Sequence, residues 1–529
     1  MRLSEDAAPE LVHTAYAREL ADTPILYEGM SLADLAHVVM LTEEDVIPRE
    51  AGGQLLHMLL SMHSRPPLDF FPDPATGDLY SNRVAYLSML TPHVGYLSAG
   101  RARREAITIA YRIPARSRLL KLAAALIDLA HAAADLAEAH SATLFPDYTY
   151  LQTAQPTTFG HYVLTFAYPI LRDLDRLRAA FARTNASPAG SGSVNGSRLP
   201  LDRERLAELL GFDTLIQHTR DAMWQADGPI EIAALISAAL VNLDRLAEDL
   251  QVFATQEFGL VELADRHSRI SVIMPQKKNP YALTYVRGLT GEIVGTLAAM
   301  AAIGKSLSGQ PDNRIFAHGS VPRSLDQVVG AAQLMAGVLR GLTVNVERAA
   351  LRAAEGFSGS TDLAEVLMLD SEAGLDYRTA HKIVGRAVRD ALESEDETSA
   401  LNAEMIAGAA EAVIGHRIEI SAERLATVLD PAAIVASRTG PGGTAEPSVT
   451  AMLAEIRAAL NIHKEWQQER GTQLAAAQTA LQTLAASLAT RPEPTVPPTD
   501  DEAQGKGGKT MGDVLSGLPR PNWRRRRWK

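Results

Sequence analysis

One segment of the chain gathers side chains that could bind and activate a charged small molecule. Residues 271–280 read Ser-Val-Ile-Met-Pro-Gln-Lys-Lys-Asn-Pro. A hydroxyl, two cations and an amide follow one another here, and the two prolines hold the backbone out of a helix. Polar loops between rigid elements often carry binding and catalytic groups. The segment predicts an anion-binding loop, although an ordinary basic entry to a helix would have the same composition.

Long helices must position this loop. Residues 118–140 place leucine and alanine on one continuous stripe, and residues 229–257 and 281–303 show the same helical spacing. No segment alternates β-branched and polar residues convincingly, and no βαβ rhythm is present. Long alanine-rich helices are typical of bundle cores. The sequence therefore predicts an all-α fold of three mainly helical domains with a central long-helix bundle.

Breaks in composition suggest where the domains begin and end. Loops rich in glycine, serine and proline occur at residues 185–197, 356–361 and 439–447. The division that we expect is an N-terminal helical domain over 1–112, the central bundle over 113–355 with loop 268–280, a C-terminal helical domain over 356–462, an extra helix over 463–490, and a disordered Pro/Gly-rich tail over 491–529.

The overall composition excludes several classes of protein. The 529 residues carry a formal net charge of −12 and no cysteine, which excludes a disulfide scaffold and a cysteine–zinc site. The first residues lack a basic stretch followed by an apolar one, so we expect no signal peptide and a soluble cytoplasmic protein. No metal-ligand cluster or phosphate-binding glycine loop is recognisable, so we expect no cofactor and no metal.

The charge distribution also bears on partners. An acidic chain is a poor general nucleic-acid binder, and we expect neither nucleic acid nor membrane as a partner. The exception is the basic end over residues 523–529. It is interpreted as a solvated tail, with a polyanion or membrane-surface contact as the alternative.

The loop also carries a family resemblance. Met274–Pro280 (MPQKKNP) resembles the signature loop of the fumarase/aspartase superfamily, in the form found in argininosuccinate lyases. Further segments resemble that family in the same order along the chain, and together they span roughly residues 10–460. These segments are GYLSAGRARRE (95–105), TYLQTAQP (149–156), QEFGLVEL (256–263), GFSGSTDLA (356–364) and GGTA (442–445).

The resemblance implies a fumarase/aspartase-like fold and a carbon–nitrogen lyase that eliminates fumarate from an N-substituted aspartate. By this resemblance Ser271 is the catalytic base, and Lys277 and Asn279 hold the carboxylate on which charge develops. Thr149 and Gln155 would orient the other carboxylate. The family assembles as a homotetramer whose active sites are drawn from three subunits, so fumarate, an amine and further copies of the chain are the expected partners.

Departures from the family pattern concern the site itself. Tyr150 stands where the family has its active-site histidine, and Thr284 stands where it has the glutamate partner of that histidine. Tyr150 or water would then protonate the departing amine. Arg104 replaces an asparagine that contacts the succinyl carboxylates, and an arginine could bind a carboxylate through two hydrogen bonds. Arg103 beside it is a further substrate-binding candidate, in a supporting role.

The amine remains open at this point. In argininosuccinate lyases a tyrosine, a glutamine and a lysine after the signature helix help bind the arginine portion, and Lys305–His318 does not reproduce them. The chain is therefore expected to act on another N-substituted aspartate, as an ethylenediamine-disuccinate lyase-like variant would. The alternatives are an authentic argininosuccinate lyase of arginine biosynthesis and a catalytically silent structural homologue.

Overall fold

The structure is a computed structural model that describes residues 5–63, 65–370, 374–393 and 401–491. The basic end of the chain, and all of the expected tail except residue 491, lie outside these residues. The chain divides into one large unit, Met1–Ala489, and a short remainder, Thr490–Lys529. Every described helix and strand belongs to the large unit.

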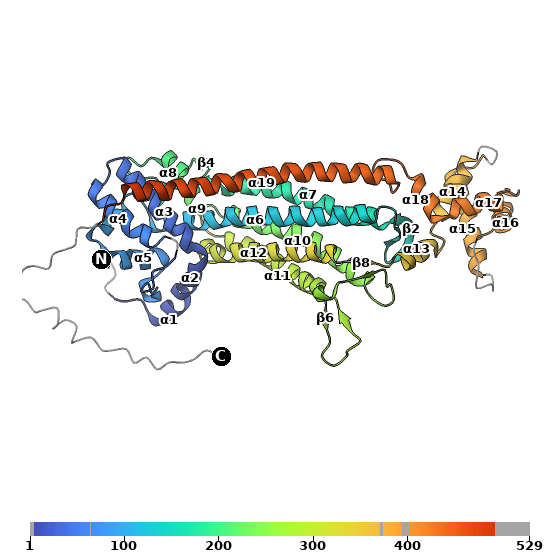
Figure 1. Cartoon of the computed structure of the whole chain (residues 1–529), viewed down its shortest axis with the longest axis horizontal. Coiled ribbons are helices and arrows are strands. Elements are labelled where there is room, and N and C mark those ends of the chain that lie inside the picture. Colours follow the sequence, from blue (N-terminus) through green and yellow to red (C-terminus); the bar gives the residue numbers. More distant parts are fainter. Residues whose placement is uncertain (1–4, 64, 371–373, 394–400, 492–529) are drawn as a thin grey trace, which may run out of the picture. The chain divides into compact units, whose positions relative to one another are not determined.

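The all-α fold is confirmed, because long helices that pack side by side form the bundle (Figure 1). α6 contacts α7, α12, α3 and α19, while α10 lies against α11, α7 and α12. The bundle helices are α6 (Arg103–Ala139), α7 (Phe159–Thr184), α10 (Asp227–Phe253), α11 (Tyr281–Gly304), α12 (Asp312–Arg340) and α19 (Glu446–Leu488).

Small residues explain how these helices approach one another. Ala130, Ala133 and Ala137 of α6 are buried in one continuous core, where a larger side chain would push the neighbouring helix away. Gly29 of α3 lies on α6 so closely that an added Cβ would come within 2.4 Å of the Ala110 carbonyl oxygen.

The N-terminal helices cover one end of the bundle, and short helices connect the long ones. The former are α1 (Pro9–Leu11), α2 (Ala17–Ala21), α3 (Thr23–Glu43), α4 (Arg49–Ser61) and α5 (Leu79–Leu90). The latter are α8 (Arg203–Leu209) and α9 (Thr219–Trp224), while α13 (Val346–Ala354) follows α12 and precedes α14.

A smaller helical unit with a hydrophobic core of its own follows α13. It consists of α14 (Ser360–Leu369), α15 (Tyr377–Glu393), α16 (Ala403–Ile414), α17 (Ala422–Leu429) and α18 (Pro431–Ser437). After α18 the chain returns along the bundle as α19, whose apolar side chains join the main core.

The strands of the described residues are short and occur in pairs. β1 (Leu144–Thr149) pairs antiparallel with β2 (Gln152–Thr158), and β6 (Arg269–Ile270) pairs antiparallel with β7 (Lys278–Asn279). The other pairs are β3 (Ala186–Ser187) with β4 (Thr214–Leu215) and β5 (Val261–Glu262) with β8 (Thr343–Val344).

The observed helices differ from the expected ones mainly in length. α10 and α11 match the stretches 229–257 and 281–303 to within a few residues, whereas α6 begins 15 residues before the expected 118. The expected domain boundary at 112/113 therefore falls inside α6. The extra helix expected over 463–490 is not separate, because α19 runs through residues 446–488 without a break. Both differences arise because buried side chains continue along these helices into neighbouring regions.

α3 and α11 are long and apolar enough to cross a membrane, judged by length and composition alone. The apolar window of α3 is 89% buried, as expected for a core helix, but that of α11 is only 28% buried. Tyr281, Tyr285 and Val294 of α11 are exposed, and nothing lies within 4 Å of a Cβ placed on its Gly288 or Gly291. α11 therefore presents an apolar surface that the described residues of one chain leave largely uncovered.

Candidate functional site

The signature loop (residues 268–280) is a hairpin that projects from the bundle between α10 and α11 (Figure 1). Its hydrogen bonds are mostly backbone bonds: the Ser271 N–H donates to the Lys277 carbonyl at 3.3 Å, and the Lys277 N–H donates to the Met274 carbonyl at 3.0 Å. The Met274 N–H donates to Ser271 Oγ at 3.1 Å. A backbone donor therefore already faces the hydroxyl on which negative charge would develop if Ser271 lost its proton.

The two lysines of the loop have different surroundings. Lys278 Nζ lies 2.7 Å from Glu262 and 2.8 Å from Asp265, and these carboxylates raise its pKa. Lys277 is exposed, and among the described residues no carboxylate lies within ion-pair distance of it. Asn279 Nδ2 donates to the Arg269 carbonyl at 2.9 Å, which ties the amide to the base of the hairpin. Lys277 is thus the loop cation that remains available to a ligand.

The β1–β2 hairpin carries a second group of predicted residues. Tyr150 and Leu151 form its turn with φ of +55° and +57°, and the Tyr150 side chain is 99% exposed. Hairpin turns of this geometry favour Asn-Gly, and non-glycine residues with positive φ cost free energy. Strain of this kind concentrates at functional sites. Thr149 is exposed beside the turn, and Gln155 is half-buried in β2.

The hairpin is anchored to the smaller helical unit. Arg438 donates to the Pro156 carbonyl of β2 at 3.2 Å and pairs with Asp362 of α14 at 2.9 Å. Arg438 therefore links residues 149–156 and 356–364, two of the segments that resemble the family.

His161 fastens the same region from α7. Its Nε2 donates to the Gly442 carbonyl at 3.0 Å, which leaves Nδ1 to accept from the Thr157 hydroxyl at 3.0 Å. Both ring nitrogens are therefore engaged in structural hydrogen bonds.

Arg103 and Arg104 lie in the first turn of α6. Arg103 pairs with Asp78 at 3.2 Å and is half-exposed, whereas Arg104 is more buried and lies 3.3 Å from Glu19. Burial raises the pKa of Glu19, and Arg104 opposes that effect. Arg101, just before α6, is fully buried against Asp34 at 2.7 Å, so its role is structural.

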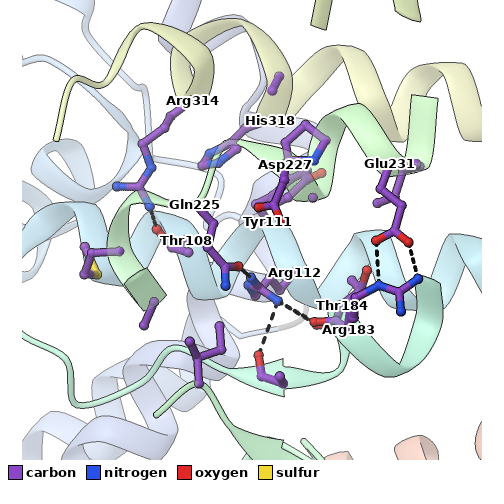
Figure 2. A pocket seen from close by; sticks show the side chains of 18 residues that line it. Thr108, Tyr111, Arg112, Arg183, Thr184, Gln225, Asp227, Glu231, Arg314 and His318 are labelled. Carbon is purple, nitrogen blue, oxygen red and sulfur yellow. Dashed lines mark hydrogen bonds and ion pairs between the residues drawn. The ribbon is translucent and has the colours of Figure 1, made fainter. Parts of the chain in front are cut away.

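A cavity of about 200 Å³ lies between α6, the end of α7, α9 and the starts of α10 and α12; we call it the α6–α12 cavity (Figure 2). His318 of α12 stacks on Tyr111 of α6 at 4.4 Å between ring centroids. Burial lowers the pKa of His318 well below its ordinary value and raises that of Tyr111, so both rings are neutral near pH 7. His318 thus packs against Tyr111 and also forms part of a cavity wall.

Two buried arginines also line this cavity. Arg112 donates to the carbonyls of Arg183 and Thr184 at 3.0 and 3.2 Å and so caps the end of α7. Arg314 donates to the Thr108 hydroxyl and lies over the Trp224 ring at 5.2 Å. Burial, together with nearby Arg104 and Arg112, lowers the pKa of Arg314 to about 9.

The predicted residues lie on three different elements. Ser271, Lys277 and Asn279 share the signature loop, and Thr149, Tyr150 and Gln155 share the β1–β2 hairpin. The hairpin packs on the end of α10 that leads into the loop, because Tyr148 contacts Phe253 and Phe258. Arg103 and Arg104 begin α6, whose 37 residues place the hairpin about 55 Å away at a rise of 1.5 Å per residue. α10 also separates the loop from the start of α6. The loop follows the end of α10, whereas the start of α10 lines the α6–α12 cavity near Arg104. One chain does not bring the three groups together.

Sequence reasoning missed Arg314 as an individual residue, although it noted that residues 305–318 depart from the family pattern. It also missed Glu105, whose carboxylate accepts the N–H groups of Gly190 and Gly192 at 2.7 and 2.6 Å. Burial raises the pKa of Glu105 to about 7. A carboxylate beside three arginines was a visible signal, but its burial depends on the distant glycine loop.

Among the described residues, no group of three or more His, Cys, Asp and Glu side chains is arranged to hold a metal ion.

Comparisons with known proteins agree with the motifs. The family described as "Lyase" matches residues 82–295, and the family described as "Argininosuccinate lyase C-terminal" matches residues 357–436. The argininosuccinate lyase of Methanoculleus marisnigri is 34% identical over 453 residues, which cover 84% of this chain and 90% of that protein. The argininosuccinate lyase of Halobacterium salinarum is 34% identical over 439 residues, covering 82% and 87%.

Solved structures extend the likeness to three dimensions. EDDS lyase in complex with formate superimposes with a TM-score of 0.82 at 30% identity, over 92% of this chain and 96% of that one. A fumarate lyase from Mesorhizobium sp. BNC1 has a TM-score of 0.66 at 17% identity, covering 86% of this chain and all of the other, and shows a shared fold.

Proposed function

The chain belongs to the argininosuccinate lyase family of the fumarase/aspartase superfamily and is a carbon–nitrogen lyase. From that premise we propose that it releases fumarate from an N-substituted aspartate other than argininosuccinate. The observation that carries the proposal is the signature loop, in which a backbone N–H faces the Ser271 hydroxyl and Lys277 has no described carboxylate partner.

The chemistry requires a proton to leave a carbon next to a carboxylate, so that a second negative charge develops on that carboxylate. Ser271 takes the proton as the deprotonated alkoxide and becomes a hydroxyl, and the Met274 N–H stabilises the negatively charged serine oxygen beforehand. Lys277 and Asn279 face the carboxylate that gains charge, where a fixed cation and an amide are most effective. Closing the projecting loop over the substrate excludes water and strengthens these contacts.

The β1–β2 hairpin supplies the other half of the reaction. Thr149 and Gln155 orient the second carboxylate, and the Tyr150 hydroxyl protonates the departing amine in place of the family histidine. Thr284 does not substitute for the missing glutamate, because its hydroxyl donates to the Pro280 carbonyl of its own helix at 3.4 Å. The strained, fully exposed turn at Tyr150 supports a role at a surface that another chain completes.

The active unit is a homotetramer in which each site combines residues of three copies. Two observations support this: the predicted residues are separated along the bundle, and α11 presents an exposed apolar surface. Helices with uncovered apolar surfaces bury them by association, and closed symmetry lets every copy contribute the same residues. A cytoplasmic location stays a prediction, based on the acidic, cysteine-free sequence.

The departures at Tyr150, Thr284 and Arg104 favour a substrate other than argininosuccinate. Arginine biosynthesis remains the second candidate, because relatives named argininosuccinate lyase match most of the chain. A variant of EDDS lyase with bound fumarate also superimposes with a TM-score of 0.82, which supports fumarate as one product here.

The direct test measures the fall in fumarate absorbance when the purified protein is given fumarate and one amine at a time, arginine included. We expect consumption with amines other than arginine. Consumption with arginine alone would restore the argininosuccinate activity, and no consumption with any amine would favour the catalytically silent homologue.

A further inference from the structure

The α6–α12 cavity contains a buried cation that the lyase chemistry above does not use. Arg314 is only 5% exposed, and its Nη1 has no hydrogen-bond partner among the described residues. Its other contacts are the Thr108 hydroxyl and the Trp224 ring, and no described carboxylate lies within ion-pair distance. Burying a charge without an opposite charge costs roughly several kcal/mol. An unpaired buried arginine therefore indicates that a ligand supplies the missing negative charge.

The walls around Arg314 are cationic and polar. Arg112 lines the same cavity, and the Tyr111 hydroxyl is buried without a partner in the described chain. Two carboxylates also line the cavity: Glu231 is bound by the guanidinium of Arg183, and Asp227 lies at the start of α10 (Figure 2). Arg112 already donates to the carbonyls of Arg183 and Thr184, so Arg314 Nη1 and the Tyr111 hydroxyl are the donors left for a ligand among the described residues, and they suit an oxyanion.

The cavity adjoins the predicted substrate site. Arg314 and His318 line it, and they also line a narrower hollow whose walls include Arg104 and Glu19. A molecule whose carboxylate is held at Arg104 can therefore extend past His318 toward Arg314. The part of the substrate that does so is the part beyond the succinyl group, namely the amine that leaves.

Resting on the proposed lyase function, we propose that the released amine carries an oxyanion group, a carboxylate or a phosphonate-type group, which binds Arg314 in the α6–α12 cavity. The volume of about 200 Å³ is below the roughly 300–1,000 Å³ of pockets for drug-sized ligands, so the occupant is small. A simple diamine would instead place a second cation beside the Arg314 guanidinium.

A matched series of amines tests the charge preference. The series shares a two-carbon chain and differs only at the far end: 3-aminopropanoate, 2-aminoethylphosphonate, ethanolamine and ethylenediamine. We expect kcat/KM for addition to fumarate to be at least about tenfold higher for the first two than for ethanolamine and ethylenediamine, because a charge-assisted hydrogen bond is lost in the latter. The ratio of the first two identifies the oxyanion.

Arg314→Met tests the residue. Methionine keeps the apolar length but removes the charge, so the KM for the better anionic amine rises about tenfold or more while the KM for fumarate stays within about twofold. Thermal stability is unchanged or higher, because the replaced cation has no described acidic partner. Arg178→Met is the control, since Arg178 also lies over a tryptophan ring, Trp466, but outside the cavity.

The outcomes separate the two proposals. A preference for ethanolamine or ethylenediamine would overturn the inference about the amine and leave the lyase intact. A rise in the KM for fumarate alone in Arg314→Met would assign Arg314 to the succinyl half and also overturn it. No fumarate consumption with any amine would overturn the proposed lyase function itself. If Arg314→Met does not fold, Arg314→Lys, which keeps the charge, must lose part of the preference for the anionic amine.

Discussion

The signature loop and the first turns of α6 hold their polar groups in opposite ways. In the loop, Ser271 and Lys277 are organised by backbone hydrogen bonds on an exposed hairpin, and Val272 beside them is 97% exposed. At α6, Glu105 is buried, and Arg314 is buried on α12, the helix that packs against α6. An exposed group gains strong electrostatic effects only when another surface covers it, whereas a buried group has them already.

The two regions depend on assembly to different extents under the proposed mechanism. There the loop provides the reactive groups, which gain a water-excluded environment from neighbouring copies and from closure. The α6 end provides recognition, and its charges are set by the packing of one chain. Substitutions in the loop should therefore change the rate of chemistry, and substitutions at α6 should change affinity or stability.

The largest effect is expected for Ser271→Ala. Removing the base should lower kcat by at least about a thousandfold without changing the oligomer, as measured by fumarate absorbance and size-exclusion chromatography. Ser268→Ala is the matched control, because the Ser268 hydroxyl donates to the Ala264 carbonyl at the base of the loop. Full activity of Ser271→Ala would show that Ser271 is not the base and that the loop does not carry the reactive group.

The two lysines offer a sharper test within the loop. Lys277→Met should lower kcat by about a hundred- to a thousandfold, because a cation aimed at the developing charge is lost. Lys278→Met should change kcat less than about threefold, since its exposed ion pairs with Glu262 and Asp265 are structural and weak. Equal losses in both variants would show that general loop charge, rather than the position of Lys277, matters.

A smaller effect is expected at the start of α6. Arg104→Asn should raise the KM for fumarate about tenfold in the addition reaction and leave kcat nearly unchanged, because a charge-assisted contact to a carboxylate is lost. Arg103→Asn is the comparison, and a change of about twofold is expected because Arg103 is half-exposed and paired with Asp78. An unchanged KM in Arg104→Asn would place Arg104 outside the substrate site.

The smallest effect concerns stability and pH. Burial raises the pKa of Glu105 to about 7 in the folded chain, so between its ordinary value and 7 the folded state keeps a proton that the unfolded state loses. The contribution of Glu105 to the unfolding free energy therefore falls as pH rises through this window, by up to about 3 kcal/mol, and is constant above it.

Melting temperatures at pH 5 and pH 8 check this prediction. The wild-type protein should lose stability relative to Glu105→Gln as pH rises, because glutamine does not titrate. A difference between the two proteins that does not vary with pH would mean that Glu105 ionises normally despite its burial.

The sequence by itself determined the fold class and the order of the chemical motifs. The long helices follow from the spacing of apolar residues, and the reactive loop follows from a hydroxyl, two lysines and prolines that lie within ten residues. These features are local, because helix periodicity and loop composition depend on neighbours along the chain.

Only the tertiary structure decided which charges are free and which are buried. The family resemblance singles out Lys277, but residue type and spacing alone do not show that Lys278 is engaged in ion pairs with Glu262 and Asp265. Arg314 contacts Thr108, a residue 206 positions away, and packing between distant helices buries its charge without a described acidic partner. The strength of a charge depends on solvent exclusion and on partners from other elements, and neither can be read from residue spacing.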